Sequence, residues 1–169
     1  MNKLSLILLF FVTLSYAGIV EDFMNNKYAK ICNFNNIRTY LKDEKMLSII
    51  GVSCVRSDKL FLLPFIVNKL KKTSYGRKNA IYFVTIFMEK KLLYSYLFDG
   101  FDINSFSFPK TDYVLSIVFD AVKNKKYVRK NNFIIVNNKN ISYYIYKKND
   151  KMIIDKFEGD KLIKRYWYR

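Results

Sequence analysis

Two cysteines, Cys32 and Cys54, are the side chains with the most defined chemistry in the chain. They do not form a Cys-x-x-Cys pair, so a redox role is not indicated, and two cysteines cannot supply the four thiolates of an all-cysteine zinc site. In an exported chain an even count predicts one disulfide. It would close a loop of about 22 residues and contribute about 3 kcal/mol if unstrained. The alternative is two buried thiols that pack as small apolar side chains.

Other reactive side chains are sparse. The chain has no histidine, which excludes Ser-His-Asp catalysis, Cys-His catalysis and His-ligated metal sites. Asp99, Asp102 and Asn104 do not match the one-three-five ligand spacing of a calcium loop, and no metal site is predicted. The acidic residues between 155 and 160 surround an expected turn, where carboxylates are common. We therefore predict no catalytic residue and no cofactor. The alternative is a glycosidase-like pair of carboxylates, because the two members of such a pair meet in the fold and need not be close in the sequence.

Aromatic and cationic side chains are interleaved near the end of the chain. Tyr144, Tyr146, Arg165 and Trp167 form the candidate binding surface, because rings among cations bind glycans or anions by stacking and charge. The alternative is ordinary cross-strand packing, with half-buried tyrosines and lysines at the sheet edges. We expect these four side chains to lie close together on an outward face.

The first residues have the pattern of a secretory signal peptide. Lys3 supplies a positive start, residues 4–14 are an apolar run, and Ser15 and Ala17 place small residues before a cut. We therefore expect 1–17 to be a cleaved signal peptide and the protein to be exported, either periplasmic or secreted.

The alternative, an uncleaved membrane anchor, needs roughly 20 apolar residues, and Glu21 and Asp22 end the run too early. The longest later dense apolar run, 80–88, stops at Glu89, so no transmembrane helix is expected after cleavage.

The chain is strongly basic, with 30 Lys+Arg against 14 Asp+Glu and a formal net charge of +16. Nucleic acid is the usual partner of a basic domain, but an exported protein rarely meets it, so no nucleic acid is expected. Acidic proteins and anionic envelope components, such as lipid head groups and acidic glycans, are the expected partners. The lysines are scattered, which is also typical of a solvated surface without a binding role.

The pattern of apolar residues changes once along the chain. Apolar segments of helical length in 18–126 predict about four to five helices, packed as helix pairs. Short alternating segments in 127–169 predict an antiparallel β-meander of about four strands packed on the helices. The expected fold class is α+β, in one compact domain.

Helices are expected over 19–31, 44–56, 60–72, 78–98 and 112–123, with a break at 33–36 and a turn at 73–76. Pro64 predicts either a kink or a helix start. The segment 78–98 is expected to form one long helix or two shorter ones, and Thr111 or Asp112 to cap the last helix.

Strands are expected over 133–136, 141–148, 152–157 and 162–168, joined by turns at 137–140, 149–150 and 158–160. Ile141, Tyr143 and Ile145 are expected to face the helices.

One segment resembles a known family. Residues 92–104 are similar to the second helix of an ankyrin repeat and its Gly-Ala-Asp-Val-Asn ending, with Phe101 in place of the alanine. The family's Thr-Pro-Leu-His opening is absent, and 79–82 stand in its place. Similar apolar segments begin at 47, 81 and 115, a period of 34 residues. The resemblance covers at most 44–124, and it implies stacked helix pairs, a protein partner and no enzyme.

These features predict an exported, non-catalytic binding protein of the cell envelope, whose partner is a protein or an anionic envelope component. The alternative is a small hydrolase that uses acidic residues in a cleft between helices and sheet. A membrane-active toxin would need a helix with one apolar face and one face of concentrated basic residues, and no segment of the sequence has this pattern clearly.

Overall fold

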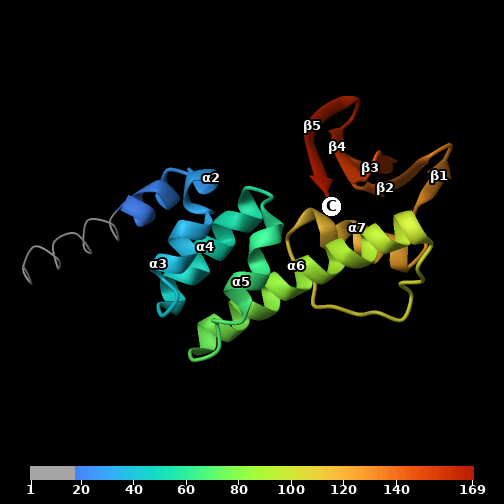
Figure 1. Ribbon diagram of the computed structural model, residues 1–169. Coiled ribbons are helices and arrows are strands. Elements are labelled where there is room, and N and C mark those ends of the chain that lie inside the picture. Colours follow the sequence, from blue (N-terminus) through green and yellow to red (C-terminus); the bar gives the residue numbers. More distant parts are fainter. Residues whose placement is uncertain (1–17) are drawn as a thin grey trace, which may run out of the picture. The chain divides into compact units, whose positions relative to one another are not determined.

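The computed structural model describes residues 18–169, so the expected signal peptide, 1–17, lies outside the described residues. Helices precede a five-stranded antiparallel sheet (Figure 1), and the predicted α+β class is confirmed. The chain divides into two compact units, one ending at Phe83 and one beginning at Val84. The predicted boundary at 126 marks the change from helix to strand, whereas the division into units falls inside one helix, α6 (Ser74–Asp99).

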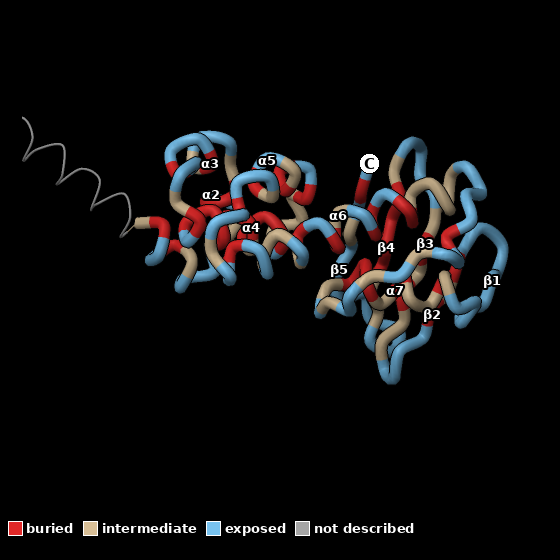
Figure 2. The backbone as a smooth tube through the Cα atoms, turned by 90° about the horizontal axis from the view of Figure 1, so that it is seen from below, coloured by how far each residue is buried: buried red, intermediate tan, exposed pale blue. Residues whose placement is uncertain are grey.

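The first unit is built around α4 (Glu44–Arg56). The Asp43 side chain accepts a hydrogen bond from the backbone N–H of Met46 at 3.0 Å and caps the helix. Apolar residues at intervals of three and four positions form a stripe on α4 that is fully or almost fully buried, and Figure 2 shows much of α4 as buried. This stripe comprises Leu47, Ile50, Cys54 and Val55.

Short helices surround α4, and their ends differ from the predictions. The expected helix over 19–31 is two helices, 18–24 and α2 (Tyr28–Ile31), because the chain turns at Asn26, where φ is 57°. The expected break at 33–36 is wrong. Asn33 accepts a hydrogen bond from the Asn36 N–H at 2.9 Å and thereby caps α3 (Phe34–Thr39).

The segment after α4 begins with a 3-10 turn, η1 (Leu60–Leu62), and continues into α5 (Leu63–Val67). Pro64 lies in the first turn of α5, so the helix-start alternative is correct and no kink is needed.

The expected turn at 73–76 is also wrong, because α6 already begins at Ser74. The Glu44 carboxylate accepts backbone N–H groups from Lys71 at 2.7 Å and Thr73 at 2.8 Å, and it also accepts the Lys72 N–H and the Thr73 hydroxyl. A side chain at Gly76 would place its Cβ 2.4 Å from a Glu44 carboxylate oxygen. Glu44 therefore fixes the segment that leads into α6.

Close packing joins α4 to the beginning of α6. A Cβ on Gly51 would lie 2.3 Å from the ring of Phe83, a residue that is fully buried. Only glycine at this position lets the aromatic ring approach the α4 backbone so closely.

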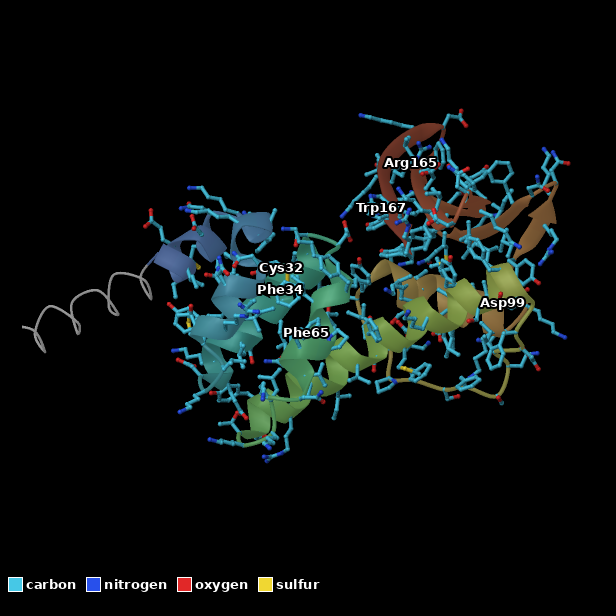
Figure 3. All side chains as sticks on the ribbon, in the orientation of Figure 1. Cys32, Phe34, Phe65, Asp99, Arg165 and Trp167 are labelled. Carbon is cyan, nitrogen blue, oxygen red and sulfur yellow. A yellow bond between two sulfur atoms is a disulfide. The ribbon has the colours of Figure 1, made fainter. Side chains whose placement is uncertain are left out.

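The predicted disulfide is confirmed: Cys32 and Cys54 are bonded, with 4.9 Å between their Cα atoms. The bond joins the residue after α2 to the last turns of α4. The Lys59 ammonium donates hydrogen bonds to the carbonyl oxygens of Ala29 and Cys32 at 2.9 and 3.1 Å, on the same side of the unit. Figure 3 labels Cys32 beside these helices.

The second unit contains the rest of α6 and α7 (Val114–Lys123). The former continues without interruption to Asp99 and ends before Gly100, where φ is 70°. The N-cap of α7 is Tyr113 rather than Thr111 or Asp112, and the Thr111 hydroxyl accepts the Tyr113 N–H at 3.3 Å. One face of α7 is apolar and buried: Val114, Leu115, Val118, Phe119 and Val122.

The sheet has five strands in the order of the sequence, one more than predicted. They are β1 (Val128–Lys130), β2 (Phe133–Asn138), β3 (Ile141–Lys148), β4 (Lys151–Glu158) and β5 (Lys161–Tyr168). The strand β1 was missed because it has three residues, all of them exposed, and no apolar alternation. Every connection has two residues, and the first of each has positive φ: Asn131, Lys139, Asn149 and Gly159. The predicted turn at 149–150 is correct, and those predicted at 137–140 and 158–160 include the observed turns at 139–140 and 159–160. The turn at 131–132 was missed together with β1.

The inner face of the sheet packs on the helices of the second unit. Tyr143 and Ile145 are buried there as predicted, while Ile141 is half-buried at the end of its strand. The hydroxyls of Tyr113 and Tyr168 lie 2.9 Å apart, and this links the segment before α7 to β5. Figure 1 shows α7 lying against the sheet.

Removal of the disulfide is expected to destabilise the first unit. The double variant Cys32→Ala/Cys54→Ala should lose about 3 kcal/mol of unfolding free energy. Without the bond, the 22-residue segment between the two positions regains its conformational entropy in the unfolded chain. Urea denaturation at pH 7 measures the loss, and reduction of the unaltered protein should reproduce it. Equal stability of the variant and the parent protein would contradict this prediction.

Glu44 is expected to make the protein sensitive to acid. Hydrogen bonds, first from the Thr73 side chain and then from the Lys72 backbone, lower the pKa of Glu44 from 4.5 to about 2. Its contribution is therefore fully present above about pH 4.5 and disappears as the pH falls towards 2. Urea midpoints between pH 6 and 2 should fall more for the parent protein than for Glu44→Gln. The exposed control Glu21→Gln should follow the parent, and parallel curves for all three proteins would contradict the assignment.

Candidate outer-face site

The register of the sheet brings the four residues of the predicted binding surface onto one face. Tyr144, Asp155 and Arg165 are paired across three strands, and Tyr146 and Trp167 lie in the next outward row, on either side of Ile153. Paired residues share a face because side chains alternate along each strand. We call the outward side of the sheet that carries these two rows the outer face.

A run of aromatic rings crosses the outer face. The Phe133 ring lies 5.0 Å from the Tyr146 ring and 6.1 Å from the Tyr144 ring, and Tyr144 lies 5.1 Å from Phe157, all in edge-on geometry. Sequence analysis missed Phe133 and Phe157. Their positions at the start of β2 and near the end of β4 indicate a contact with Tyr144 only when the strand register is known.

A buried carboxylate holds the middle of the outer face together. Asp155 is 5% exposed and accepts two hydrogen bonds from the Arg165 guanidinium, at 2.7 and 2.8 Å. The Tyr146 hydroxyl donates a third, at 3.1 Å. Burial and then the Asp155 charge raise the pKa of Tyr146, and the hydrogen bond to Asp155 raises the pKa of Arg165. The Tyr146 hydroxyl therefore stays neutral and the Arg165 guanidinium stays charged.

Trp167 lies on β5, the strand that also carries Arg165 (Figure 3), and its side chain remains exposed. Its exposed fraction is 56%, and the Lys151 ammonium lies 4.4 Å from the centre of its ring, close enough for a cation–π interaction. A buried Trp167 would have made the outer face a simple packing surface. Its exposure keeps the binding-surface hypothesis open.

The strand β5 extends the exposed apolar area. It forms one edge of the sheet, and Leu162 and Ile163 are both exposed on it. The register between β4 and β5 shifts between Lys156 and Phe157, so that Ile163 has no paired position. Such a bulge and the lysines of β5 discourage pairing with another strand at this edge.

The first unit has a smaller exposed aromatic group that sequence analysis also missed. Phe34 and Phe65, both labelled in Figure 3, contact each other edge-on at 4.9 Å. Phe61 is exposed one helical turn before Phe65. Phe34 lies in the expected break at 33–36, and Phe61 and Phe65 lie in the expected helix over 60–72, so nothing in the sequence singled them out.

The strongest candidate for acid chemistry is Glu89 on α6. It is 1% exposed, and the Ser116 hydroxyl lies 2.7 Å from both of its carboxyl oxygens. Burial raises the pKa of Glu89 to about 7; the Ser116 hydrogen bond lowers it and the nearby Asp120 carboxylate raises it. A hollow of about 350 Å³ is lined by Ser116, Thr111 and Asp120, but Glu89 itself does not line it.

Two further properties bear on function. Within residues 18–169, no helix is long and apolar enough to cross a membrane. The same residues contain no cluster of three or more His, Cys, Asp or Glu side chains arranged to hold a metal ion.

Comparison with known protein families, with curated proteins and with solved structures finds no match. The ankyrin resemblance of 92–104 therefore stays a prediction. In the structure these residues are the end of α6 and the loop after Gly100.

Glu89 is expected to lower stability as the pH rises. Its pKa is raised in the folded protein, so the unfolded chain ionises first, and stability falls between about pH 4.5 and 7. A change from 4.5 to about 7 corresponds to about 3 kcal/mol. The neutral variant Glu89→Gln should lack this loss, so that its stability relative to the parent improves from pH 5 to 8. Urea denaturation at several pH values measures this, with Glu158→Gln as the exposed control. An unchanged difference between variant and parent across that range would refute the assignment.

Proposed function

We propose that the protein is an exported, non-catalytic binding protein whose outer face binds an acidic protein partner. The observation that carries this proposal is the exposed Trp167, held beside a fixed network of Tyr146, Asp155 and Arg165. Tryptophan, tyrosine and arginine dominate the binding energy of protein interfaces. Here they occur together on one rigid surface.

Charge supports an acidic partner rather than a neutral one. The formal net charge is +16, and the expected loss of 1–17 removes only Lys3 and no acidic residue. Such a charge attracts acidic proteins and speeds their association. Because Asp155 already pairs with Arg165, the lysines around the outer face, such as Lys151, supply most of the attraction.

Export is supported by two independent features. The first is the signal-peptide pattern of 1–17. The second is the bond between Cys32 and Cys54, because disulfides persist in oxidising compartments such as the periplasm and the extracellular space.

A small hydrolase that uses acidic residues is the second candidate, and the raised pKa of Glu89 favours it. A general acid must reach its substrate, however, and Glu89 is buried behind Ser116. The outer face needs no rearrangement to contact a partner, so we favour binding over hydrolysis.

Substitution of Trp167 is expected to weaken partner binding without unfolding the protein. Immobilised parent protein and Trp167→Ala would be used to capture proteins from the envelope fraction, and each captured protein would be purified and titrated by calorimetry. Loss of a central interface tryptophan typically costs about 2 kcal/mol or more, so we expect affinity to fall at least about tenfold.

The matched control is Phe101→Ala, which removes an exposed aromatic ring outside the sheet. It should bind as the parent does. The proposal fails if Trp167→Ala binds normally, or if Phe101→Ala loses as much affinity.

A further inference from the structure

A hollow of about 570 Å³ lies in the second unit, and none of its lining residues belongs to β5, the strand that carries Trp167. The last turn of α6 with Gly100 forms one wall, the β1–β2 hairpin forms a second wall, and Lys147 of β3 completes the lining. Small-molecule sites usually have volumes of roughly 300–1,000 Å³, and they combine apolar walls with a few polar groups. This hollow has the size and composition of such a site.

Two cations lie in the lining, and both belong to the inner side of the sheet. Arg129 is paired with Ile134, an inner-face residue, and Lys147 follows the inner-face residue Ile145 by two positions. Among residues 18–169, the structure pairs neither cation with a carboxylate, and none of the lining residues is acidic. Asp99 is exposed at the end of α6, as Figure 3 shows, and it is not part of the lining.

Neutral groups hold both cations in place. The Lys147 ammonium lies 3.4 Å from the Phe98 carbonyl oxygen and 5.1 Å from the centre of the Phe98 ring, which in turn stacks on Tyr94 at 4.2 Å. A guanidinium nitrogen of Arg129 lies 3.5 Å from the Tyr96 hydroxyl, which is 2.8 Å from the Tyr127 hydroxyl. These contacts orient the cations without neutralising their charge.

We propose that this hollow binds a small organic anion, with a carboxylate or phosphate head and a flat apolar body. Arg129 and Lys147 would hold the head, because charge-assisted hydrogen bonds to such groups are strong and an arginine can bind them with two donors. The ring of Phe98 and the side chains of Leu97 and Ile134 would contact the apolar body. The proposal does not depend on the outer face or on its protein partner.

The test uses residues 18–169, labelled with ¹⁵N. The protein is titrated with phenyl phosphate and with benzoate, and the amide chemical shifts are followed by NMR. Saturable shifts should be confined to the amides of 96–100, 129–134 and those near Lys147. Inorganic phosphate lacks the apolar body and benzyl alcohol lacks the charge, so each should bind at least about fivefold more weakly than phenyl phosphate. Preference for phenyl phosphate or for benzoate identifies the head group.

Arg129→Gln and Lys147→Gln should each weaken phenyl phosphate binding about tenfold, since each removes one charged hydrogen-bond donor. The control Lys148→Gln removes the same charge from the next residue of β3, outside the lining, and should change affinity less than about twofold. Trp167→Ala should leave binding unchanged. The proposal is overturned by the absence of saturable binding, by an equal loss in Lys148→Gln, or by a loss in Trp167→Ala.

Discussion

The two-residue connections of the C-terminal sheet decide which side chains share a face. Side chains alternate along each strand, so paired residues lie together on the core side or on the outward side. By this pairing Tyr144 joins Asp155 and Arg165, whereas Tyr143 enters the core. A shift of one residue in a connection would exchange the two faces of a strand, burying cations and exposing core residues. The outer face and the position of Lys147 in the hollow both depend on this register.

Asp155 illustrates how the register is reinforced. A buried carboxylate costs several kcal/mol unless it is paired and hydrogen-bonded. Arg165 of β5 and Tyr146 of β3 meet that requirement together, so the strands β3, β4 and β5 must keep their alignment to avoid the cost. The same contacts immobilise the surroundings of Trp167. A surface that is fixed before binding loses less conformational entropy when a partner arrives.

The sequence predicts the interiors of the elements better than their ends. The apolar stripe of α4 and the alternation in β3 follow directly from burial, so these elements were predicted correctly. Asn33 and Thr73 were assigned to a break and a turn, because residues that form turns also cap helices. For Thr73, the contact of Glu44 with the segment 71–73 determines that α6 begins directly after this residue. It joins residues 27 to 29 positions apart, and no local pattern reports it.

The sequence predicted that the candidate site residues lie on one face of the sheet. It did not predict which of the arginines is paired with a carboxylate. Arg165 and Arg129 look alike in the sequence, each near lysines and a tyrosine. The fold gives Arg165 a buried carboxylate, whereas Arg129 contacts the hydroxyl of Tyr96. A carboxylate at hydrogen-bond distance cancels most of the field of a guanidinium, so Arg165 orients its neighbours and attracts anions weakly. Arg129 keeps its attraction. For this reason, binding at the outer face should depend mainly on the exposed ring of Trp167, and binding in the hollow mainly on charge.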